Sequence, residues 1–376
     1  MALQRICDPM LPELSQVFQA PISEVSQVIS MFAITYGLMQ LFYGPMGDRF
    51  GKYRVVMLAT MLCSVGSLLS ALSVNLEFLV AARMGSALVA AAIIPLSLAW
   101  VGDVVHYEQR QETLARVGLG TMLGITAGQL FGGLLTDTLG WRWAFGLMAM
   151  AFASVSFLLW QQLPHSEPMV SHAHAPGGFF KQLKQIAHDA WVRTLLGIAM
   201  LEGAMIFGML AVTASHLHHL HHISLTLAGG TTAMFGLGGM AYMAAAKFAI
   251  RRLGEVGLAK FGSLYFGVSF LVVAFCSWWQ LALPSCFVAG LGFAMFHNTM
   301  QAKATQMVPT ARGTGMALFA GFLFLGQSLG VLLLTTLMGH FSSGHVLGAV
   351  AIGVMLLGAF FAHAIAKRNA TQVDHA

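Results

Sequence analysis

The sequence has little charge for its length, and this shortage excludes most soluble folds. Only 9% of its 376 residues are Asp, Glu, Lys or Arg, whereas soluble domains average about 25%. Its four cysteines are scattered and form neither a disulfide framework nor the close spacing of a metal site. No basic segment precedes a short apolar run at the start, so no cleavable signal peptide is expected. The sequence also has no glycine-rich nucleotide-binding loop, which argues against ATP as an energy source.

Long apolar runs take the place of the missing charge. The chain is 57% hydrophobic, and stretches of about 20 apolar residues, each long enough to cross a bilayer core of roughly 30 Å, recur along nearly its whole length. Such runs predict an all-α membrane protein. Eleven full spans are expected, at 25–43, 53–74, 78–101, 114–136, 141–162, 191–215, 227–249, 259–279, 282–306, 313–339 and 344–366.

The basic residues are sorted to one side of these spans. If the loop at 44–54 is cytoplasmic, every Lys and Arg except Arg5, Arg83 and Arg142 lies on that same side. This is the asymmetry that the positive-inside rule describes, and it places the C-terminus in the cytoplasm. The net charge of +5 is then explained by loops anchored at the membrane surface, and no nucleic-acid partner is expected.

A polar break divides the chain into two parts. Residues 163–190 contain three prolines and a Gly-Gly pair, which is typical of a linker. The end of this linker, 179–187, has apolar residues at helical spacing with lysines between them and predicts a short helix on the inner membrane surface. The expected organisation is therefore a first half at 1–162, a linker at 163–190, a second half at 191–366 and a cytoplasmic tail at 367–376.

The loop at 44–54, Gly-Pro-Met-Gly-Asp-Arg-Phe-Gly-Lys-Tyr-Arg, carries the most specific pattern in the chain. It resembles the loop between helices 2 and 3 of the major facilitator superfamily, roughly Gly-x-x-x-Asp-Arg-x-Gly-Arg/Lys-x-Arg, as found in bacterial drug and sugar efflux-type permeases. The resemblance implies a secondary transporter with two six-helix halves related by a pseudo-two-fold axis. It also implies an inner-gate loop in which a charge network latches the cytoplasmic face; a solvated anchor is the alternative. The residues of this gate are Gly44, Asp48, Arg49, Gly51 and Arg54.

The two halves share short sequence echoes at matching places. Arg49-Phe50-Gly51 returns as Arg252-Leu253-Gly254, and Gly128-Gln129-x-x-Gly132 returns as Gly326-Gln327-x-x-Gly330. These positions agree with a parallel duplication of six helices, as in major facilitator transporters.

Only part of the expected first helix is visible in the sequence. Residues 1–18 are too short and too polar to cross a bilayer. One interpretation is a segment lying at the membrane surface. The other, favoured because Asp8-Pro9-Met10-Leu11-Pro12 resembles the outer end of helix 1 in the family, is that the first half of helix 1 is missing, as a start codon assigned too far downstream would produce.

Two further patterns resemble family motifs in helices 4 and 5. Arg83, in the run Leu79-x-x-x-Arg83…Pro95, matches an arginine that the family links to proton transfer, and an Arg at this depth should face the bundle interior. The run that starts at Gly124 matches a glycine pattern of family antiporters, although simple helix packing is the alternative. Its Gln129 stands where that pattern has Pro, which removes the expected kink and weakens the case for antiport. The matching residues are Gly124, Gly128, Gln129 and Gly132.

Glu202 is the leading candidate for proton coupling. It lies about 11 residues into its span, or roughly 16 Å deep at 1.5 Å per residue, close to the bilayer midplane. A carboxylate at this depth could bind a proton or a cationic group; a neutral Glu hydrogen-bonded to a neighbouring helix is the alternative. Arg83 is expected to tune this proton, and Asp8 is a second candidate carboxylate.

Other polar residues point to a cavity and to an outer loop. Five side chains in the second and tenth helices could line a polar cavity or simply join helices: Tyr36, Gln40, His297, Asn298 and Gln301. The tract from His216 to His222 could capture a metal ion, but the following Ser224-Leu225 is similar to an ordinary family loop, so a solvated outer loop rich in His is expected.

These observations predict a multi-pass transporter of the inner, cytoplasmic membrane. The hypothesis is proton-coupled efflux of a small amphipathic compound by alternating access, with membrane lipid and the substrate as partners, a monomeric state, and the proton gradient in place of any cofactor. A facilitator or importer remains the alternative within the same class. Outside that class, the alternatives are a transporter-like sensor that does not cycle and, less favoured, a membrane-embedded enzyme with His-bound metal.

Overall fold

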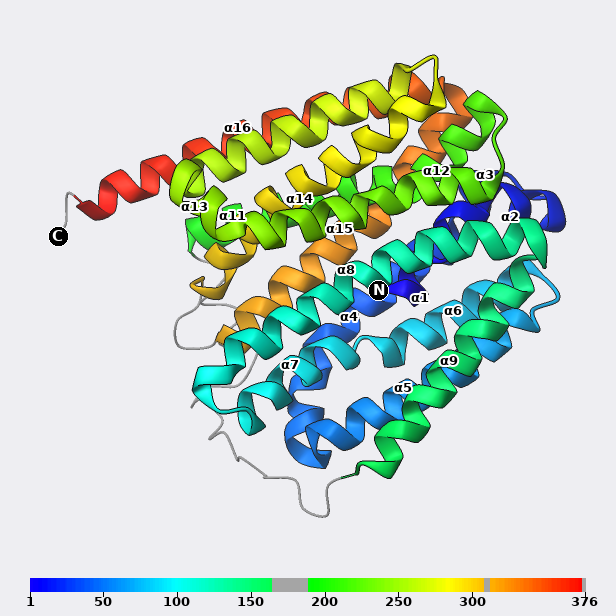
Figure 1. The fold of residues 1–376 in the computed structure, drawn as a ribbon, viewed down its shortest axis with the longest axis horizontal. Coiled ribbons are helices and arrows are strands. Elements are labelled where there is room, and N and C mark those ends of the chain that lie inside the picture. Colours follow the sequence, from blue (N-terminus) through cyan, green and yellow to red (C-terminus); the bar gives the residue numbers. More distant parts are fainter. Residues whose placement is uncertain (164–188, 308–311, 374–376) are drawn as a thin grey trace.

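The computed structural model describes residues 1–163, 189–307 and 312–373, and the regular structure in these ranges is helical (Figure 1). Ten of the described helical segments are long and apolar enough to cross a membrane. One of them, α13 (Leu225–Phe275), has 51 residues and contains Gly254 with a non-helical backbone (φ 61°, ψ 179°). At 1.5 Å per residue it is far too long for one crossing, so its two legs are two spans. The predicted all-α membrane fold with eleven full spans is confirmed.

The first half contains the N-terminal segment and five full spans. The spans are built from α3 and α4, α5, α6 with α7, α8, and α9. The bounds are α1 (Ala2–Arg5), η1 (Asp8–Met10), α2 (Leu11–Phe18), α3 (Ile22–Val25), α4 (Gln27–Phe50), α5 (Lys52–Ala71), α6 (Leu76–Ala90), α7 (Ile93–Val104), α8 (Tyr107–Thr138) and α9 (Trp141–Gln161).

The second half contains six spans, and the first of them is interrupted by a π-helical turn, η2. The last helix continues past the predicted end of its span at 366. The bounds are α11 (Ala190–Glu202), η2 (Gly203–Phe207), α12 (Gly208–His221), α13 (Leu225–Phe275), η3 (Trp279–Leu281), α14 (Ala282–Thr305), α15 (Arg312–His340) and α16 (Ser343–Val373). The surface helix expected at 179–187, and most of the linker, lie outside the described residues.

The N-terminal segment lies inside the bundle, so the alternative interpretation of a segment lying at the membrane surface is wrong. Leu3, Gln4, Arg5 and Asp8 are at most 4% exposed. In Figure 1 the N-terminus lies in the middle of the bundle near α4 and α8, and α1 packs on α8. Apolar Leu3 and Ile6 pack in this position, and the polar side chains beside them find partners within the protein.

Two segments predicted as loops are largely helical. α4 continues through the motif at 44–54 to Phe50, and the turn is made by Gly51 alone, at φ 88°. Gly47 lies within this helix at a point of close packing, where a Cβ would meet the side chain of Leu96. Likewise α12 extends through the histidine tract, and His222 ends it in the left-handed conformation at φ 53°.

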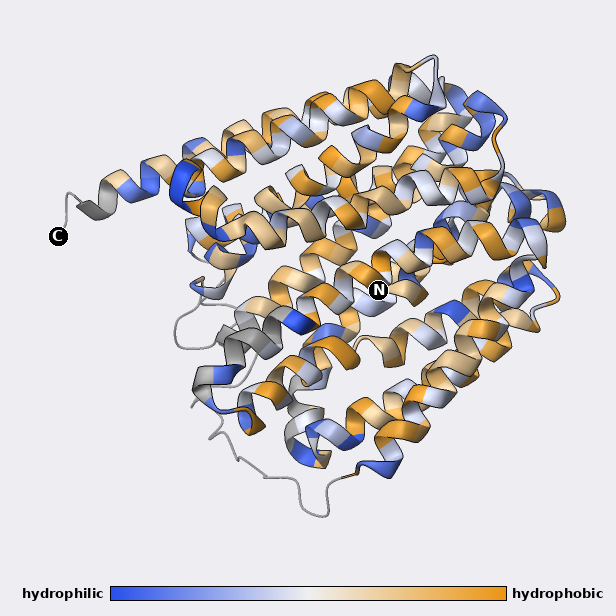
Figure 2. Cartoon of the chain, in the orientation of Figure 1, coloured by the Kyte–Doolittle hydropathy of each residue, from blue (hydrophilic) through white to orange (hydrophobic). Residues whose placement is uncertain are grey.

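The surface of the bundle is apolar along its sides, as lipid requires. Large apolar side chains on α5, α9 and α16 are exposed, among them Leu58, Phe157 and Leu356. Figure 2 shows hydrophobic residues along the lengths of the helices and hydrophilic ones gathered toward their ends. A water-soluble protein would not expose such patches.

The two halves are joined firmly at one end of the bundle. We call the end that carries Arg49, Lys52 and Arg54 the basic end, and the opposite end the far end. At the far end, Ser26 on the first half bonds to Thr335 on the second at 3.0 Å. Asp137 accepts hydrogen bonds from the backbone N–H and hydroxyl of Thr226, both at 2.6 Å. α2, α3 and α12 gather at this end in Figure 1.

Close helix contacts at glycines repeat at corresponding positions of the two halves. A Cβ on Gly128 would meet the backbone of Ala2, and one on Gly132 would meet that of Ile6. The second half repeats this arrangement: Gly326 faces Met200, and Gly330 faces Ala204. All four second-half positions lie 198 residues after their first-half counterparts (326 − 128 and 200 − 2, for example). The helix pair α1–α8 therefore corresponds to α11/η2–α15, as the pseudo-two-fold arrangement predicts.

Candidate functional site

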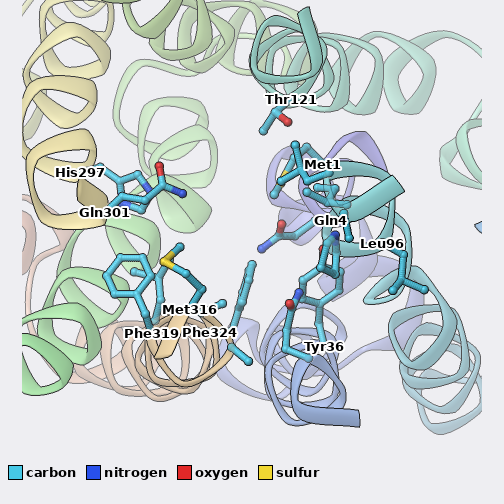
Figure 3. Close-up of a pocket in the computed structure, with 18 of the residues that line it drawn as sticks. Met1, Gln4, Tyr36, Leu96, Thr121, His297, Gln301, Met316, Phe319 and Phe324 are labelled. Atoms are coloured by element: carbon cyan, nitrogen blue, oxygen red, sulfur yellow. The ribbon is translucent and has the colours of Figure 1, made fainter. Parts of the chain in front are cut away.

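A cavity of about 810 Å³ lies between the two halves. Its wall comes from α1, α4, α5, α7 and α8 on one side and from η2, α14 and α15 on the other. Figure 3 shows His297 and Gln301 facing Met1, Gln4 and Tyr36 across this space. The volume falls in the range of small-molecule sites, roughly 300–1,000 Å³.

The two sides of the cavity differ in chemistry. The second half contributes mainly aromatic and apolar side chains, including Phe207, Phe293, Phe319 and Phe324. The first half contributes most of the polar groups, which are Gln4, Arg5, Tyr36, Gln40, Lys52, Asp103 and Thr121. Such a wall can hold an apolar body on one side and hydrogen-bond a polar group on the other.

Glu202 is buried next to His297, whose side chain lines this cavity. The Glu202 side chain is fully buried, and its Oε1 lies 3.0 Å from Nδ1 of His297, whose side chain is 16% exposed and lines the cavity. The imidazole is held by stacking on Phe293, with ring centroids 5.0 Å apart. Oε2 of Glu202 has no hydrogen-bond partner among the described residues. A buried carboxylate with one cavity-facing imidazole is an arrangement suited to accepting a proton.

The π-helical turn η2 begins directly after Glu202. Its Gly203 lies against the backbone of α15, where a Cβ would overlap the carbonyl oxygen of Leu323. The close approach holds the Glu202 segment against α15. Single π turns inside α-helices are frequent at functional sites because they reposition one side chain.

Asp8, the second predicted carboxylate, lies in a buried polar cluster. Its Oδ2 accepts hydrogen bonds from Nη1 of Arg5 at 3.3 Å and from Nε2 of Gln129 at 2.7 Å. The Arg5 guanidinium also covers the Phe207 ring, 4.6 Å from its centroid, and contributes to the cavity wall. Because Phe207 belongs to the second half, Arg5 bridges the halves as well as neutralising Asp8.

Arg83 points into the first half and joins its segments. It is fully buried, donates from Nη1 to the carbonyl of Leu3 at 2.6 Å and from Nε to that of Val28 at 3.2 Å, and lies over the Phe32 ring at 4.2 Å. It is absent from the cavity wall as described. The geometry gives it a role in holding the N-terminal segment against α4.

Ion pairs lie at the basic end of each half with reversed polarity. Lys52, directly after the Gly51 turn, pairs with Asp103 of α7 at 2.5 Å. Glu255, directly after the Gly254 turn, pairs with Lys303 of α14 at 2.6 Å. Lys52 and Asp103 also line the cavity mouth. The first half thus has its cation at the turn, and the second half has its anion there.

The predicted gate loop is only partly described. Arg49 lies over the ring of Phe50, 5.3 Å from its centroid. Gly51 makes the turn. The surroundings of Gly44 and of the Asp48 side chain are not described, so the predicted gating role of Asp48 and Arg49 stays a prediction.

Four of the five predicted cavity residues belong to the described cavity wall. Tyr36, Gln40, His297 and Gln301 line the cavity, whereas its described wall does not include Asn298. Sequence reasoning missed Gln4, Arg5 and Asp103. Arg5 did stand out as one of three basic residues that break the charge sorting, and a breach of that rule is a usable signal of a buried functional group. Gln4 and Asp103 had no such signal.

The histidine tract does not form a metal site in the described part of the chain. Within the described residues, no group of three or more His, Cys, Asp or Glu side chains is placed to hold a metal ion. His216 is buried and bonds to Ser343 Oγ at 2.8 Å and to the Val273 carbonyl at 3.2 Å. His218 bonds to the Ile223 carbonyl at 2.7 Å, just past the end of α12. The expectation of a solvated outer loop is therefore wrong, because the tract forms the last turns of α12 and these contacts hold it there.

The sequence profile of the Major Facilitator Superfamily matches residues 2–331, so the chain belongs to this family of membrane transporters. A protein of Mannheimia succiniciproducens described as a "Probable sugar efflux transporter" is 24% identical over 355 residues, covering 91% of this chain and 86% of that protein. The "Quinolone resistance protein NorB" of Staphylococcus aureus is 28% identical over 150 residues, covering 40% of this chain and 32% of that protein.

Solved structures show the same fold at low identity. A bacterial homologue of the human lysosomal transporter Spinster, in an inward-facing and unoccupied conformation, superposes with a TM-score of 0.77 at 16% identity and covers 96% of this chain and 92% of that one. The nucleoside transporter NupG gives 0.78 at 14% identity, covering 97% and 94%. The protein is therefore a multi-pass membrane protein with the major facilitator fold.

Proposed function

We propose that the protein is a proton-coupled exporter of a small amphipathic compound, acting as a monomer in the inner membrane with its basic end and C-terminus in the cytoplasm. The Glu202–His297 pair beside the cavity carries this proposal. A cavity that reaches the basic end while the far end is closed is one of the two states that alternating access requires.

The proton would move in two steps. A proton arriving through the cavity binds Nε2 of His297, and the proton on Nδ1 passes to Oε1 of Glu202, 3.0 Å away. The imidazole is then neutral again, and Glu202 is neutral in a site that excludes water. The return of the proton restores the buried carboxylate. The energy source is the gradient itself, without a cofactor.

The substrate class follows from the two walls and from the relatives. Aromatic rings on the second half would pack on an apolar surface, and the amides of Gln4, Gln40 and Gln301 would bond polar substituents. One relative is described as a probable sugar efflux transporter and another as a quinolone resistance protein, and sugars and quinolones both combine rings with polar groups. A small amphipathic substrate fits both observations.

The test uses everted membrane vesicles in which a dye reports the pH gradient. Addition of a panel of sugars and quinolones should dissipate the gradient when one of them is exchanged for protons. Glu202→Gln should abolish the dissipation, while counterflow of the same compound continues. Glu77→Gln, which changes an exposed Glu at the start of α6, is the control and should behave as the wild type.

Two results would go against the proposal. If Glu202→Gln dissipates the gradient with an unchanged pH dependence, the proton does not reside there. If the wild type shows counterflow and no dissipation, the protein is a facilitator.

A further inference from the structure

The side chain of Gln129 connects Asp8 to the second half. Gln129 is fully buried; its Nε2 donates to Asp8 Oδ2 at 2.7 Å, and its Oε1 accepts from the hydroxyl of Thr232 at 2.9 Å. Thr232 belongs to α13, so one amide touches the N-terminal segment and the opposite half of the molecule. An ionised carboxylate can only accept hydrogen bonds, so the charge on Asp8 fixes which end of the amide faces it.

The bond across the halves can be released without leaving the Thr232 hydroxyl unpaired. The hydroxyl of Thr232 has one proton and two acceptors, Oε1 of Gln129 and the carbonyl of Gly229, each at 2.9 Å. When the proton turns to Gly229, Thr232 satisfies itself within α13. The cost of giving up the contact then falls on Oε1 of Gln129 alone, because the Thr232 hydroxyl keeps a partner.

Asp8 has one oxygen open to a proton. Its Oδ1 is buried and has no hydrogen-bond partner within the described part of the chain. The charged groups near the carboxyl are Arg5, from the same segment, and Arg83, from α6; Cys7 is the neighbouring thiol. α8 and α13 contribute neutral groups, Gln129 and Thr232. A proton on Oδ1 would remove the charge and leave Oδ2 a neutral acceptor.

The second half lacks this connection. Gln327 corresponds to Gln129, 198 positions later, and accepts a hydrogen bond from Gln4 at 2.9 Å. Its Nε2 is buried and has no hydrogen-bond partner among the described residues. The position that corresponds to Asp8 is Ile206, which offers no acceptor. Gln129 therefore makes a contact that depends on the charge of a carboxylate, and its counterpart Gln327 does not.

We propose that Gln129 is a positioning residue that couples the proton on Asp8 to the contact between α8 and α13; this rests on the proposed proton-coupled function. With Asp8 ionised, a charge-assisted bond about twice as strong as a neutral one holds the amide with its carbonyl toward Thr232. With Asp8 protonated, that bond weakens, Thr232 turns to Gly229, and the halves are freed to move along this line. The Pro of the family pattern could form neither bond.

The experiment measures amide hydrogen exchange of the full-length protein between pH 5 and 8, corrected for intrinsic rates, and needs no substrate. In the wild type, residues 225–236 should lose protection as the pH falls. Thr232→Val should lose about tenfold in protection at high pH and most of the pH response. Thr232→Ser should restore both. Thr231→Val is the matched control, because the neighbouring buried Thr231 hydroxyl has no hydrogen-bond partner among the described residues.

Other variants test which groups cause the pH dependence of the exchange protection. Asp8→Asn and Gln129→Leu should show low protection that does not change with pH, and Glu202→Gln should keep the wild-type response. An unchanged pH response in Thr232→Val would overturn the inference, as would its loss in Thr231→Val. These outcomes are independent of the vesicle test, so a failure of gradient coupling at Glu202 is recognised separately. If Gln129→Leu does not fold, the two threonine variants still decide.

Discussion

The guanidinium of Arg83 is surrounded by the first half and donates to carbonyls of two other segments. Arg83→Lys keeps the charge but replaces a planar fork by a point charge that cannot reach Leu3 and Val28 together. The unfolding free energy should fall by about 1.5–3 kcal/mol, the range for hydrogen bonds to charged groups. Thermal unfolding in detergent measures this loss.

Arg142→Lys is the control for this substitution. The exposed Arg142 donates to the carbonyl of buried Ser73 at 2.9 Å and lies over Trp141. Water replaces its bond more readily, so the loss should be smaller. Equal losses in the two variants would mean that the burial of Arg83 contributes little.

At the level of elements, the two turns at the basic end depend on glycine. Gly254 has φ 61° and ψ 179°, a conformation that costs residues with a Cβ about 1–3 kcal/mol. Gly254→Ala should therefore lower stability by about that amount, although nothing within 4 Å obstructs the added methyl group.

Gly197→Ala separates backbone strain from the loss of a glycine as such. Gly197 is helical, and an added Cβ there also meets nothing within 4 Å. This variant should be neutral or slightly more stable, since Ala favours helix over Gly. Chemical denaturation of both variants is the measurement, and a neutral Gly254→Ala would contradict the strain argument.

Elements were the most predictable feature of the fold. Apolar runs located all eleven full spans because hydropathy acts locally along the chain. Their ends were less accurate: Gly47 and the histidine tract looked like loops, but Gly47 packs closely on Leu96 within a helix, and His218 and His222 cap the helix that contains the tract.

The candidate site was less accessible to sequence reasoning. Glu202 and His297 were each selected for depth or polarity, yet their contact joins residues 95 positions apart. The bond from Gln129 to Asp8 spans 121 positions. Gln129 was noted as a departure from the family pattern, and only the fold showed what the amide contacts.

At the scale of the whole molecule, the ion pairs at the basic end can be tested by exchanging their charges. Lys52→Asp or Asp103→Lys alone should lower stability by about 1 kcal/mol, because both side chains are only 12% and 14% exposed and the change creates a like-charge pair. The double exchange should recover most of that loss. A double-mutant cycle in thermal unfolding measures the coupling.

The Glu255–Lys303 pair is the comparison for this cycle. Glu255 is 44% exposed, so solvent screens the pair more strongly and the coupling should be smaller. If the two cycles give the same coupling, burial is not what sets the strength of these pairs.

The reversed order of charge in the two halves has a consequence for the alternating access proposed above. Asp103 and Lys303 lie near the ends of corresponding helices, α7 and α14, so the pseudo-two-fold axis relates an anion in the cavity wall of the first half to a cation at the basic end of the second half. Had the duplication kept its polarity, narrowing the mouth would bring like charges together. With one copy reversed, the two pairs present opposite charges at corresponding positions, which would lower the electrostatic cost of bringing the halves together at this end in the transport cycle proposed above.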